Sequence, residues 1–343
     1  MEIYRRYNPF RKPAITFYGG EPLLEFELIK NIIEYIKSKY HNVDVLYNMT
    51  TNGILLKKDI VKFMVENNVN IAVSLDGYKE NHDRNRVFVN GDGTFDIIMA
   101  NLSEIRENYP NYFYNNLSIL VCYDWKTDLF KMEEFFTIHK NELPPLGRIS
   151  LVSPFFTNKK QLSEIKKKYF NLIIDRKISP FLEIFIGSSY RQLLLIEKIT
   201  RSRPVFILYT STCIPGSKLC VDVNGEFHVC EKVNYSFPIG DVYRGIDYNS
   251  IVKMLREYKK CIMDSCKNCP ITRLCSMCFA TFMKDRTFDK DPPEICDRLI
   301  DEVKKELSEL YKILEENPSF NVVLSNLNKK HWKNMFTFID CEL

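Results

Sequence analysis

The sequence predicts an α/β protein in which part of a β/α barrel is followed by a small cysteine-rich domain. In the first half of the chain, short apolar runs alternate with segments of helical spacing, which is the pattern of parallel β–α–β units. From about residue 205 the pattern changes to a hairpin signal and a dense series of cysteines. We therefore expect domains at 1–205 and 206–300, with a C-terminal helix and tail at 301–343.

Five apolar runs in the first half are predicted strands. They are AITFYG, VDVLYNM, NIAVSL, NLSILVC and RISLVS, at residues 14–19, 43–49, 70–75, 116–122 and 148–153. Helical spacing of apolar residues occurs at about 25–39, 57–67, 94–109 and 128–140. This alternation favours part of a β/α barrel over an antiparallel sheet. Because barrel enzymes place their sites at the C-terminal ends of the strands, the loops there are candidate sites.

The second half contains a predicted hairpin and a long helix. LCVDVNGEFHVC reads as two alternating runs joined by Asn224-Gly225, which is a strong signal for a type I′ turn. Asp291-Pro292-Pro293 interrupts the cysteine-rich region, and a helix is predicted from about 295 to 315. The apolar positions of that helix are Leu299, Ile300, Val303, Leu307, Leu310 and Leu314.

Composition excludes several function classes. The net charge of +4 is small beside 48 basic and 44 acidic side chains, so charge does not indicate a nucleic-acid partner. No apolar run approaches the roughly 18–20 residues of a membrane span. The basic start, MEIYRRYNPFRK, is not followed by an apolar segment and is not a signal peptide. We therefore expect a cytoplasmic protein without a membrane partner.

Polar loops follow three successive predicted strands. They are GGEP at 19–22, TTNG at 50–53, and SLDG at 74–77 with HDRNR at 82–86. Glycines at a strand end let the backbone approach a ligand closely, and the Glu21 carboxylate suits an ammonium group. The alternative is that these are ordinary βα turns, in which Gly, Asn and Asp are common.

Cysteines are concentrated in the second half of the chain. Only Cys122 lies in the first 212 residues, and eight of the remaining ten lie between Cys213 and Cys278. A reducing cytosol disfavours disulfides, so this density favours a metal site. The two C-x2-C pairs of CKNCPITRLCSMC are five residues apart, whereas a zinc ribbon separates them by about 15–20. Eight cysteines form two complete four-thiolate sets, as two [4Fe–4S] clusters require.

The predicted hairpin raises one difficulty for shared ligation. With a two-residue loop, Cys220 faces Val229, and Cys220 and Cys230 point to opposite faces of the ribbon. Binding of one cluster by both thiols then requires a bulge, or requires that one cysteine lies beyond the paired region.

Over roughly residues 13–300 the sequence resembles radical S-adenosylmethionine (SAM) enzymes with a SPASM domain. The resemblance rests on FYGGEPLL, TTNG, SLDG with Arg86 downstream, and the cysteine series. The family pattern is C-x9–15-G-x4-C, then C-x2-C-x5-C-x3-C, then a last C. The chain departs from it at Cys278, which follows Cys275 after two residues instead of three.

The resemblance implies cofactor ligands at defined positions. It assigns SAM contacts to Gly19, Gly20, Glu21, Asn52, Ser74, Asp76 and Arg86, with Gly20 and Glu21 at its amino group. It assigns a first auxiliary [4Fe–4S] cluster to Cys213, Cys220, Cys230 and Cys278. It assigns a second to Cys266, Cys269, Cys275 and Cys296. Glu231 occupies the position of the catalytic base in sulfatase-maturating relatives.

The resemblance also implies a reaction. Family members use a third [4Fe–4S] cluster and SAM to make a 5′-deoxyadenosyl radical, which abstracts hydrogen from a peptide. The auxiliary clusters accept the electron, since four thiolates leave no open coordination site. Within the family the chain looks most like maturases of cysteine-rich ribosomal peptides, which form thioether cross-links. The implied partners are a cysteine-rich precursor peptide and an electron donor such as ferredoxin or flavodoxin.

The family's C-x3-C-x2-C motif, which binds the SAM-cleaving cluster, is absent from this sequence. We expect a truncated form of a longer enzyme, with a natural member that lacks SAM cleavage as the alternative. The chain alone is then predicted not to make 5′-deoxyadenosine. Other hypotheses are an anaerobic sulfatase maturase, a non-catalytic iron–sulfur binding or electron-transfer module, and a zinc protein.

Overall fold

The computed structural model describes residues 12–152, 159–175, 177–187, 190, 218–231, 237–272, 274–275, 277–284, 287–288 and 294–320. The chain divides into two compact units, whose described parts lie within residues 12–187 and 190–320. They are called unit 1 and unit 2, and each is described by itself. The predicted domain boundaries at 205/206 and 300/301 stay predictions, and the first lies outside the described residues.

Unit 1 is built on a five-stranded sheet in which every neighbouring pair is parallel. Its spatial order follows the chain: β1 (Ala14–Phe17), β2 (Leu46–Thr51), β3 (Asn70–Ser74), β4 (Leu117–Tyr123) and β5 (Leu146–Leu151). The predicted parallel β/α architecture is confirmed. All five predicted strands exist.

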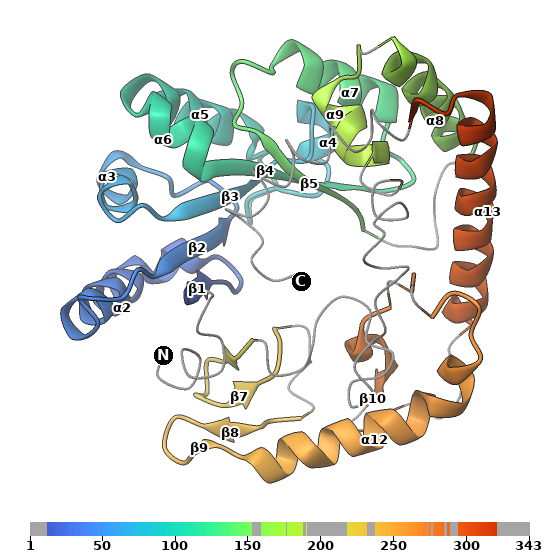
Figure 1. The fold of residues 1–343 in the computed structure, drawn as a ribbon. Coiled ribbons are helices and arrows are strands. Elements are labelled where there is room, and N and C mark those ends of the chain that lie inside the picture. The colour runs from blue at the N-terminus through green and yellow to red at the C-terminus, as the bar shows by residue number, and fades with distance from the viewer. Residues whose placement is uncertain are drawn as a thin grey trace. The chain divides into compact units, whose positions relative to one another are not determined.

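Helices connect the strands and lie on one side of the sheet (Figure 1). The long ones are α2 (Phe26–Lys39), α3 (Lys58–Glu66), α5 (Phe95–Asn108) and α7 (Leu129–Ile138), which match the four predicted helices to within two residues. Shorter elements are η1 (Pro22–Glu25), α4 (Lys79–His82) and α6 (Pro110–Asn116). After β5 come α8 (Lys159–Ile174), α9 (Pro180–Leu182) and the π-helical turn η2 (Glu183–Gly187), none of which was predicted.

The sheet face toward the helices is apolar and tightly packed. Its buried side chains include Tyr47, Met49, Ile71, Val73, Leu117, Ile119 and Val121. A Cβ added to Gly53 would lie 2.9 Å from Val73 and 3.3 Å from Ile98 of α5, so strand and helix pack directly beside this glycine. This face is the hydrophobic core of unit 1.

The opposite face, called the inner face, carries mostly small polar side chains. By strand register it consists of Ala14, Thr16, Leu46, Asn48, Thr50, Asn70, Ala72, Ser74, Ser118, Leu120, Cys122, Arg148 and Ser150. Amides bridge it, since Asn116 donates to Asn70 and Asn70 donates to Asn48, each at 3.0 Å. Parallel strands packed on both faces are normally apolar on both. A polar face therefore suits contact with ligand better than contact with a second layer of helices.

Unit 2 contains short hairpins and two long helices. The hairpins are β6 (Cys220–Val221) with β7 (Phe227–His228), β8 (Gly240–Asp241) with β9 (Gly245–Ile246), and β10 (Met283–Lys284) with β11 (Thr287–Phe288). The helices are α12 (Tyr248–Lys267) and α13 (Ile295–Glu316), and a 3₁₀ turn, η3 (Phe279–Phe282), lies between them. The predicted cysteine-rich region with a hairpin and a C-terminal helix is confirmed.

Helix α12 was not predicted, although its signal is present in the sequence. Asp247 caps the helix by accepting from the backbone N–H groups of Asn249 and Ser250. Met254, Tyr258 and Ile262 follow at four-residue intervals and are buried. The cysteines in and after this segment favoured a metal-binding loop, although the apolar residues have helical spacing.

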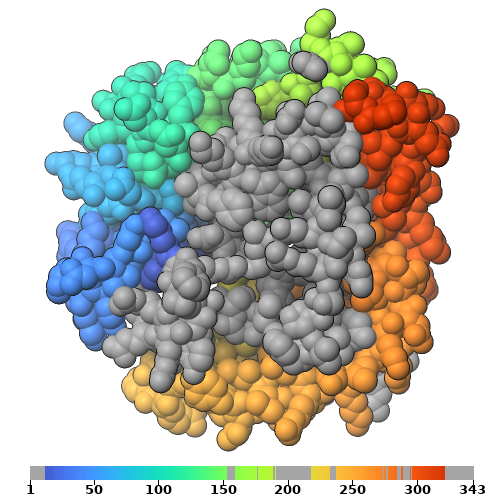
Figure 2. Space-filling view, viewed as in Figure 1, coloured from blue at the N-terminus to red at the C-terminus, as the bar shows by residue number. Residues whose placement is uncertain are grey.

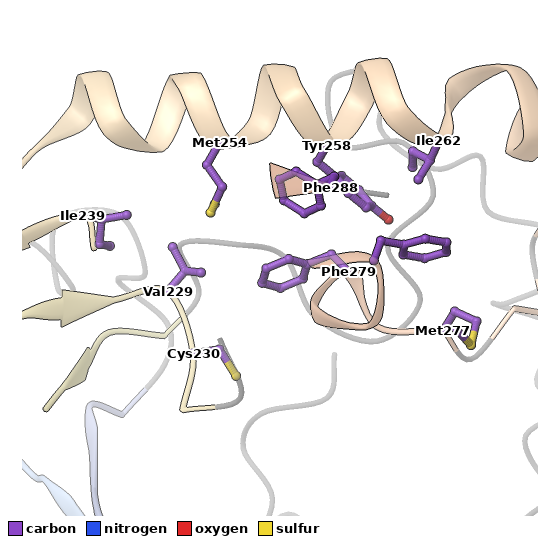
Figure 3. Close-up of a cluster of buried hydrophobic side chains, with 10 residues drawn as sticks. Val229, Cys230, Ile239, Met254, Tyr258, Ile262, Met277, Phe279 and Phe288 are labelled. Carbon is purple, nitrogen blue, oxygen red and sulfur yellow. The ribbon is translucent and has the colours of Figure 1, made fainter. Parts of the chain in front are cut away.

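The core of unit 2 lies under α12. Met254, Tyr258 and Ile262 point from the helix toward Val229 and the 3₁₀ turn that carries Phe279 (Figure 3). The Tyr258 ring lies 5.3 Å from that of Phe288, between centroids. Cys230, 5% exposed, lies at the edge of this cluster. The outer side of α12 forms a band of the surface (Figure 2).

Candidate functional site

The residues predicted to contact SAM lie at the C-terminal ends of three successive strands. Gly19, Gly20 and Glu21 follow β1, Asn52 follows β2, and Ser74 ends β3 with Asp76 and Arg86 beyond it. Because β1, β2 and β3 are adjacent and parallel, these groups share one edge of the sheet. A Cβ added to Gly19 or Gly20 would meet no atom within 4 Å, so the backbone there is open to a ligand.

Glu21 joins the first two strand ends. Its carboxylate accepts hydrogen bonds from Thr51 Oγ1 at 2.7 Å, Asn52 N–H at 2.7 Å and Leu23 N–H at 3.1 Å. The Asn52 side chain is turned to its own loop, where Oδ1 accepts from Ile54 N–H at 2.9 Å. All three donors to Glu21 are neutral, and no described residue forms an ion pair with it. No described cation therefore neutralises this carboxylate at the open edge.

Asp76 holds Arg86 instead of facing the open edge. Arg86 Nε and Nη2 donate to the two Asp76 oxygens at 2.6 and 3.3 Å, and Cys122 N–H donates to Oδ1 at 2.8 Å. The Asp76 side chain is 7% exposed and that of Arg86 is 30% exposed. Burial alone would lower the Arg86 pKa, but its hydrogen bond and attraction to Asp76 raise it. Of these two residues, Arg86 is the one whose charge is available to a ligand, and Asp76 orients its guanidinium group.

His82 supports the same loop, and the sequence showed it only as part of a polar motif. It is fully buried, and its Nδ1 accepts from Asp76 N–H at 3.1 Å. Nε2 then donates to Thr94 Oγ1 at 3.0 Å, and that hydroxyl donates to the Arg86 carbonyl at 2.8 Å. Burial lowers the pKa of His82 from 6.5 to about 4, so the ring is neutral near pH 7. The chain Asp76–His82–Thr94–Arg86 fixes the loop after β3.

The hairpin that carries Cys220 and Cys230 differs from the predicted type I′ turn. Asp222 N–H donates to the Glu226 carbonyl at 3.0 Å, which closes a three-residue loop over Val223, Asn224 and Gly225. Only Gly225 in this loop has a positive φ, at +78°. A type I turn followed by a left-handed glycine is the usual three-residue hairpin. The two-residue prediction was therefore wrong.

The longer loop changes which residues face each other. Cys220 pairs with His228, one residue earlier than the predicted partner Val229. β7 ends at His228, so Cys230 lies beyond the paired region and strand alternation does not determine its face. The predicted difficulty for shared ligation therefore does not apply, because Cys230 is outside the paired strands. Cys213, the remaining hairpin-side ligand of the prediction, lies outside the described residues.

Glu231 lies beside the hairpin cysteines. The Cys230 thiol donates to Glu231 Oε2 at 3.1 Å, and Lys218 Nζ lies 4.0 Å from Oε1. Burial raises the pKa of the Cys220 thiol, and the charges of Glu231 and Asp222 raise it further. The structure therefore places the predicted base next to the predicted ligands. Its role as a base stays a prediction.

The four cysteines predicted to share the second cluster line one pocket of about 270 Å³. Cys266 lies at the end of α12, Cys269 and Cys275 in the following loop, and Cys296 at the start of α13. Burial raises the pKa of Cys296, and the nearby Cys275 and Cys269 raise it further. Cys261 also lines this pocket, whereas Cys278 does not. The split of CKNCPITRLCSMC between two sites agrees with this geometry and stays a prediction.

Another group of metal-ligand type lies on the hairpin loop. Ligand atoms of Asp222, Glu226 and His228 lie within 4.8 Å of one another, and among the described residues no three cysteines form such a group. Asp222 is committed to the loop, because Oδ1 accepts from the N–H groups of Asn224 and Glu226 and Oδ2 pairs with His228 Nε2. The group is therefore explained by hairpin closure.

Comparison with known proteins identifies the N-terminal part. Residues 1–124 match the model of the radical SAM superfamily. The chain contains a radical SAM domain. This agrees with the open parallel sheet and the ligand-type residues at its C-terminal edge.

Curated proteins similar to this chain include several maturases. The cysteine-type anaerobic sulfatase-maturating enzyme of Clostridium novyi (strain NT) is 33% identical over 138 residues, 39% of this chain and 36% of that enzyme. The enzyme of the same name from Clostridium perfringens (strain ATCC 13124) is 24% identical, over 76% of this chain and 72% of that enzyme. The radical SAM cyclopropyl synthase TigE of Paramaledivibacter caminithermalis is 20% identical, over 79% and 55%. The chain spans about a third of the length of the C. novyi relative.

Solved structures share the fold. The structure described as native anSMEcpe with bound AdoMet and Kp18Cys peptide has a TM-score of 0.62 at 20% identity, covering 96% of this chain and 89% of that one. Native anSMEcpe with bound AdoMet has a TM-score of 0.62 at 19% identity, covering 96% and 88%. At this identity the match supports the fold alone. None of the helices in the described part of the chain is long and apolar enough to cross a bilayer.

Proposed function

We propose that the chain functions in a radical SAM maturase, an oxidoreductase-type enzyme that modifies a peptide or protein substrate. The radical SAM domain and the homology to sulfatase-maturating enzymes and a cyclopropyl synthase support this class. The observation that carries it for this chain is the convergence of Glu21, Ser74 and Arg86 on one edge of the sheet.

The strand-end site fits the amino-acid part of SAM. Glu21 offers an uncompensated carboxylate for the ammonium group, next to the open backbone of Gly19 and Gly20. Arg86, held by Asp76, offers guanidinium N–H groups for the carboxylate, and the Ser74 hydroxyl lies on the inner face nearby. These residues bind and orient the ligand. SAM together with a reduced [4Fe–4S] cluster supplies hydrogen-atom abstraction when both are bound.

The cysteine sites fit iron–sulfur clusters better than zinc. Four thiolates around one zinc ion, each at about 2.3 Å, bring the sulfurs to within about 4 Å of one another. No three of the described cysteines lie that close, although five of them line one pocket. A larger cluster suits this spacing. We propose Cys266, Cys269, Cys275 and Cys296 for one auxiliary cluster, and Cys220, Cys230 and Cys278, with Cys213 outside the described residues, for the other.

Thioether formation in a cysteine-rich peptide is the finer proposal, and it rests on the sequence resemblance. The homology to cysteine-type sulfatase-maturating enzymes supports a second candidate, oxidation of a cysteine in a sulfatase-like substrate. Mass spectrometry of the products from a cysteine-rich peptide and from a sulfatase-like peptide distinguishes these two reactions. A thioether removes two hydrogen atoms and keeps the sulfur, whereas cysteine oxidation of the sulfatase type removes the sulfur.

SAM binding tests the proposal without requiring turnover. Equilibrium dialysis of the anaerobically reconstituted chain should show saturable binding of SAM. Arg86→Gln should weaken it at least tenfold, whereas Arg106→Gln, on the surface of α5, should leave it unchanged. Absence of saturable SAM binding, or equal loss in the two variants, would contradict the proposed site.

A further inference from the structure

We propose that Arg148 binds a carboxylate of the peptide substrate on the inner face of the sheet, and so selects peptides with an acidic group near the modified residue. This inference rests on the proposed function, because it names the chemistry of the substrate for the same site.

The position of Arg148 comes from strand register. Arg148 pairs with Leu120, Leu120 pairs with Ser74, and all three lie on the inner face. The register shifts between Ile119 and Leu120, where Gly147 takes the extra place on β5. This irregularity decides the face on which Arg148 points. Arg148 is thus level with Ser74 and two strand spacings away, about 10 Å between backbones.

Arg148 is the one charged residue among the inner-face positions of the five strands. It is exposed, and no described residue forms a hydrogen bond or ion pair with it. Among the described residues, this arginine projects from its strand between Thr, Asn, Ser and Cys and has no anionic partner. The planar guanidinium pairs best with a carboxylate, through two parallel hydrogen bonds.

The nearby anions are already committed. Asp76 is bound by Arg86, and Asp124 is bound by Arg84 at 2.7 Å. Cys122, next to Arg148 on β4, is not a thiolate: burial and the charge of Asp76 raise its pKa despite Arg86 and Arg148. Glu21 has no ion-pair partner among the described residues, but it follows β1 at the other end of the strand order from β5. A carboxylate from outside the chain would therefore complete the charge balance at Arg148.

Two ligands of the proposed enzyme carry a carboxylate, and their positions distinguish them. In SAM the carboxylate and the ammonium are attached to the same carbon, so the carboxylate must lie close to the ammonium group that Glu21 would bind. Glu21 follows β1, four strand spacings from β5, about 19 Å along the sheet. Arg148 therefore lies too far away to bind the SAM carboxylate, and its ligand would be a carboxylate of the peptide.

A peptide array tests this inference on the reconstituted full chain with SAM. The probes are synthetic cysteine-containing peptides in which Asp, Asn or Lys is placed at each position in turn, and binding is measured by fluorescence anisotropy. We expect the wild type to bind the Asp peptide at least tenfold more tightly than the Asn peptide at one position. Arg148→Gln should abolish this difference, Arg148→Glu should favour Lys there, and Arg106→Gln should change nothing.

Several outcomes would overturn the inference while leaving the proposed function intact. One is a wild type that binds SAM but shows no acidic preference at any position. Another is an Arg148→Gln variant that keeps the preference. A third is an Arg148→Gln variant whose SAM affinity falls tenfold, because the carboxylate would then belong to SAM. Loss of SAM binding by the wild type would instead overturn the proposed function.

Discussion

At the scale of single residues, the Asp76 carboxylate accepts two sets of hydrogen bonds. It holds the Arg86 guanidinium through two hydrogen bonds, and it accepts from the backbone of Cys122 on the neighbouring strand. Charge-assisted hydrogen bonds of this kind each contribute about 1.5–3 kcal/mol. The loop after β3 and the end of β4 therefore depend on one buried carboxylate.

The Asp76→Asn variant tests whether the negative charge of Asp76 orients the Arg86 guanidinium group. The amide keeps the shape but removes the charge, so Arg86 loses its orientation and SAM affinity should fall about tenfold, or about 1.4 kcal/mol. Calorimetric titration with SAM measures the change. Asp92→Asn is the matched control, since Asp92 contacts only the exposed loop around Asn90. Unchanged affinity in Asp76→Asn would show that Arg86 is oriented by other groups.

His82 should make the stability of unit 1 depend on pH. The folded protein keeps the ring neutral down to about pH 4, whereas the unfolded chain binds a proton near pH 6.5. Its contribution is therefore complete above pH 6.5 and is lost as the pH falls toward 4, by up to roughly 3 kcal/mol. Asp76, Arg86 and Asp83 are the charged neighbours that modify this value.

Urea unfolding at several pH values measures the effect. His82→Gln should be less stable than the wild type at pH 7.5, because two buried hydrogen bonds are altered. It should also lose less stability than the wild type between pH 7 and pH 4.5. The partly exposed His139 provides the control variant, His139→Gln. Parallel pH profiles for wild type and His82→Gln would show that His82 titrates normally.

At the scale of elements, hairpin loop length decides which face a cysteine occupies. The three-residue loop sets Cys220 against His228, two residues before Cys230. A shift of one residue exchanges the two faces of a strand. Deletion of Asn224 should therefore prevent the two thiols from sharing a cluster.

Iron analysis checks this prediction. Deletion of Asn224 should lower the iron content from about eight to about four per chain, if two [4Fe–4S] clusters form in the wild type. Asn224→Ala keeps the loop length and should keep all the iron. Retention of eight irons by the deletion variant would show that the hairpin register does not control ligation.

The two cysteine groups can be separated by single substitutions. Cys278 does not line the pocket formed by Cys266, Cys269, Cys275 and Cys296. Cys278→Ala should therefore lose the hairpin cluster and keep the other, and Cys296→Ala should do the opposite. Electron paramagnetic resonance of the reduced variants should show two different remaining signals. The same remaining signal in both variants would leave the split unsupported.

At the scale of the whole molecule, metal content separates the competing classes. Anaerobically purified protein should contain about eight irons and matching sulfide per chain, since eight cysteines form two four-thiolate sets. Zinc with little iron would contradict the assignment. Apo-protein made by chelation should lose unit 2 structure first, because its short hairpins and loops have few strand hydrogen bonds of their own.

Local patterns in the sequence determined most of the architecture. Apolar periodicity placed five strands and four helices of unit 1 and located α13, because each of these signals lies within one element. Cysteine spacing argued against a zinc ribbon. The same local reading missed α12 and α8, since ligand-type and charged residues concealed their apolar spacing.

Only the tertiary structure decided which side chains meet. The hairpin register depends on hydrogen bonds that close the loop between Asp222 and Glu226, and these determine the face of Cys220. The pairing of Asp76 with Arg86 joins residues ten positions apart through a loop held by buried His82. The register shift between β4 and β5 places Arg148 on the inner face of the sheet. Such contacts depend on the path of loops and on strand register, so spacing along the chain does not reveal them.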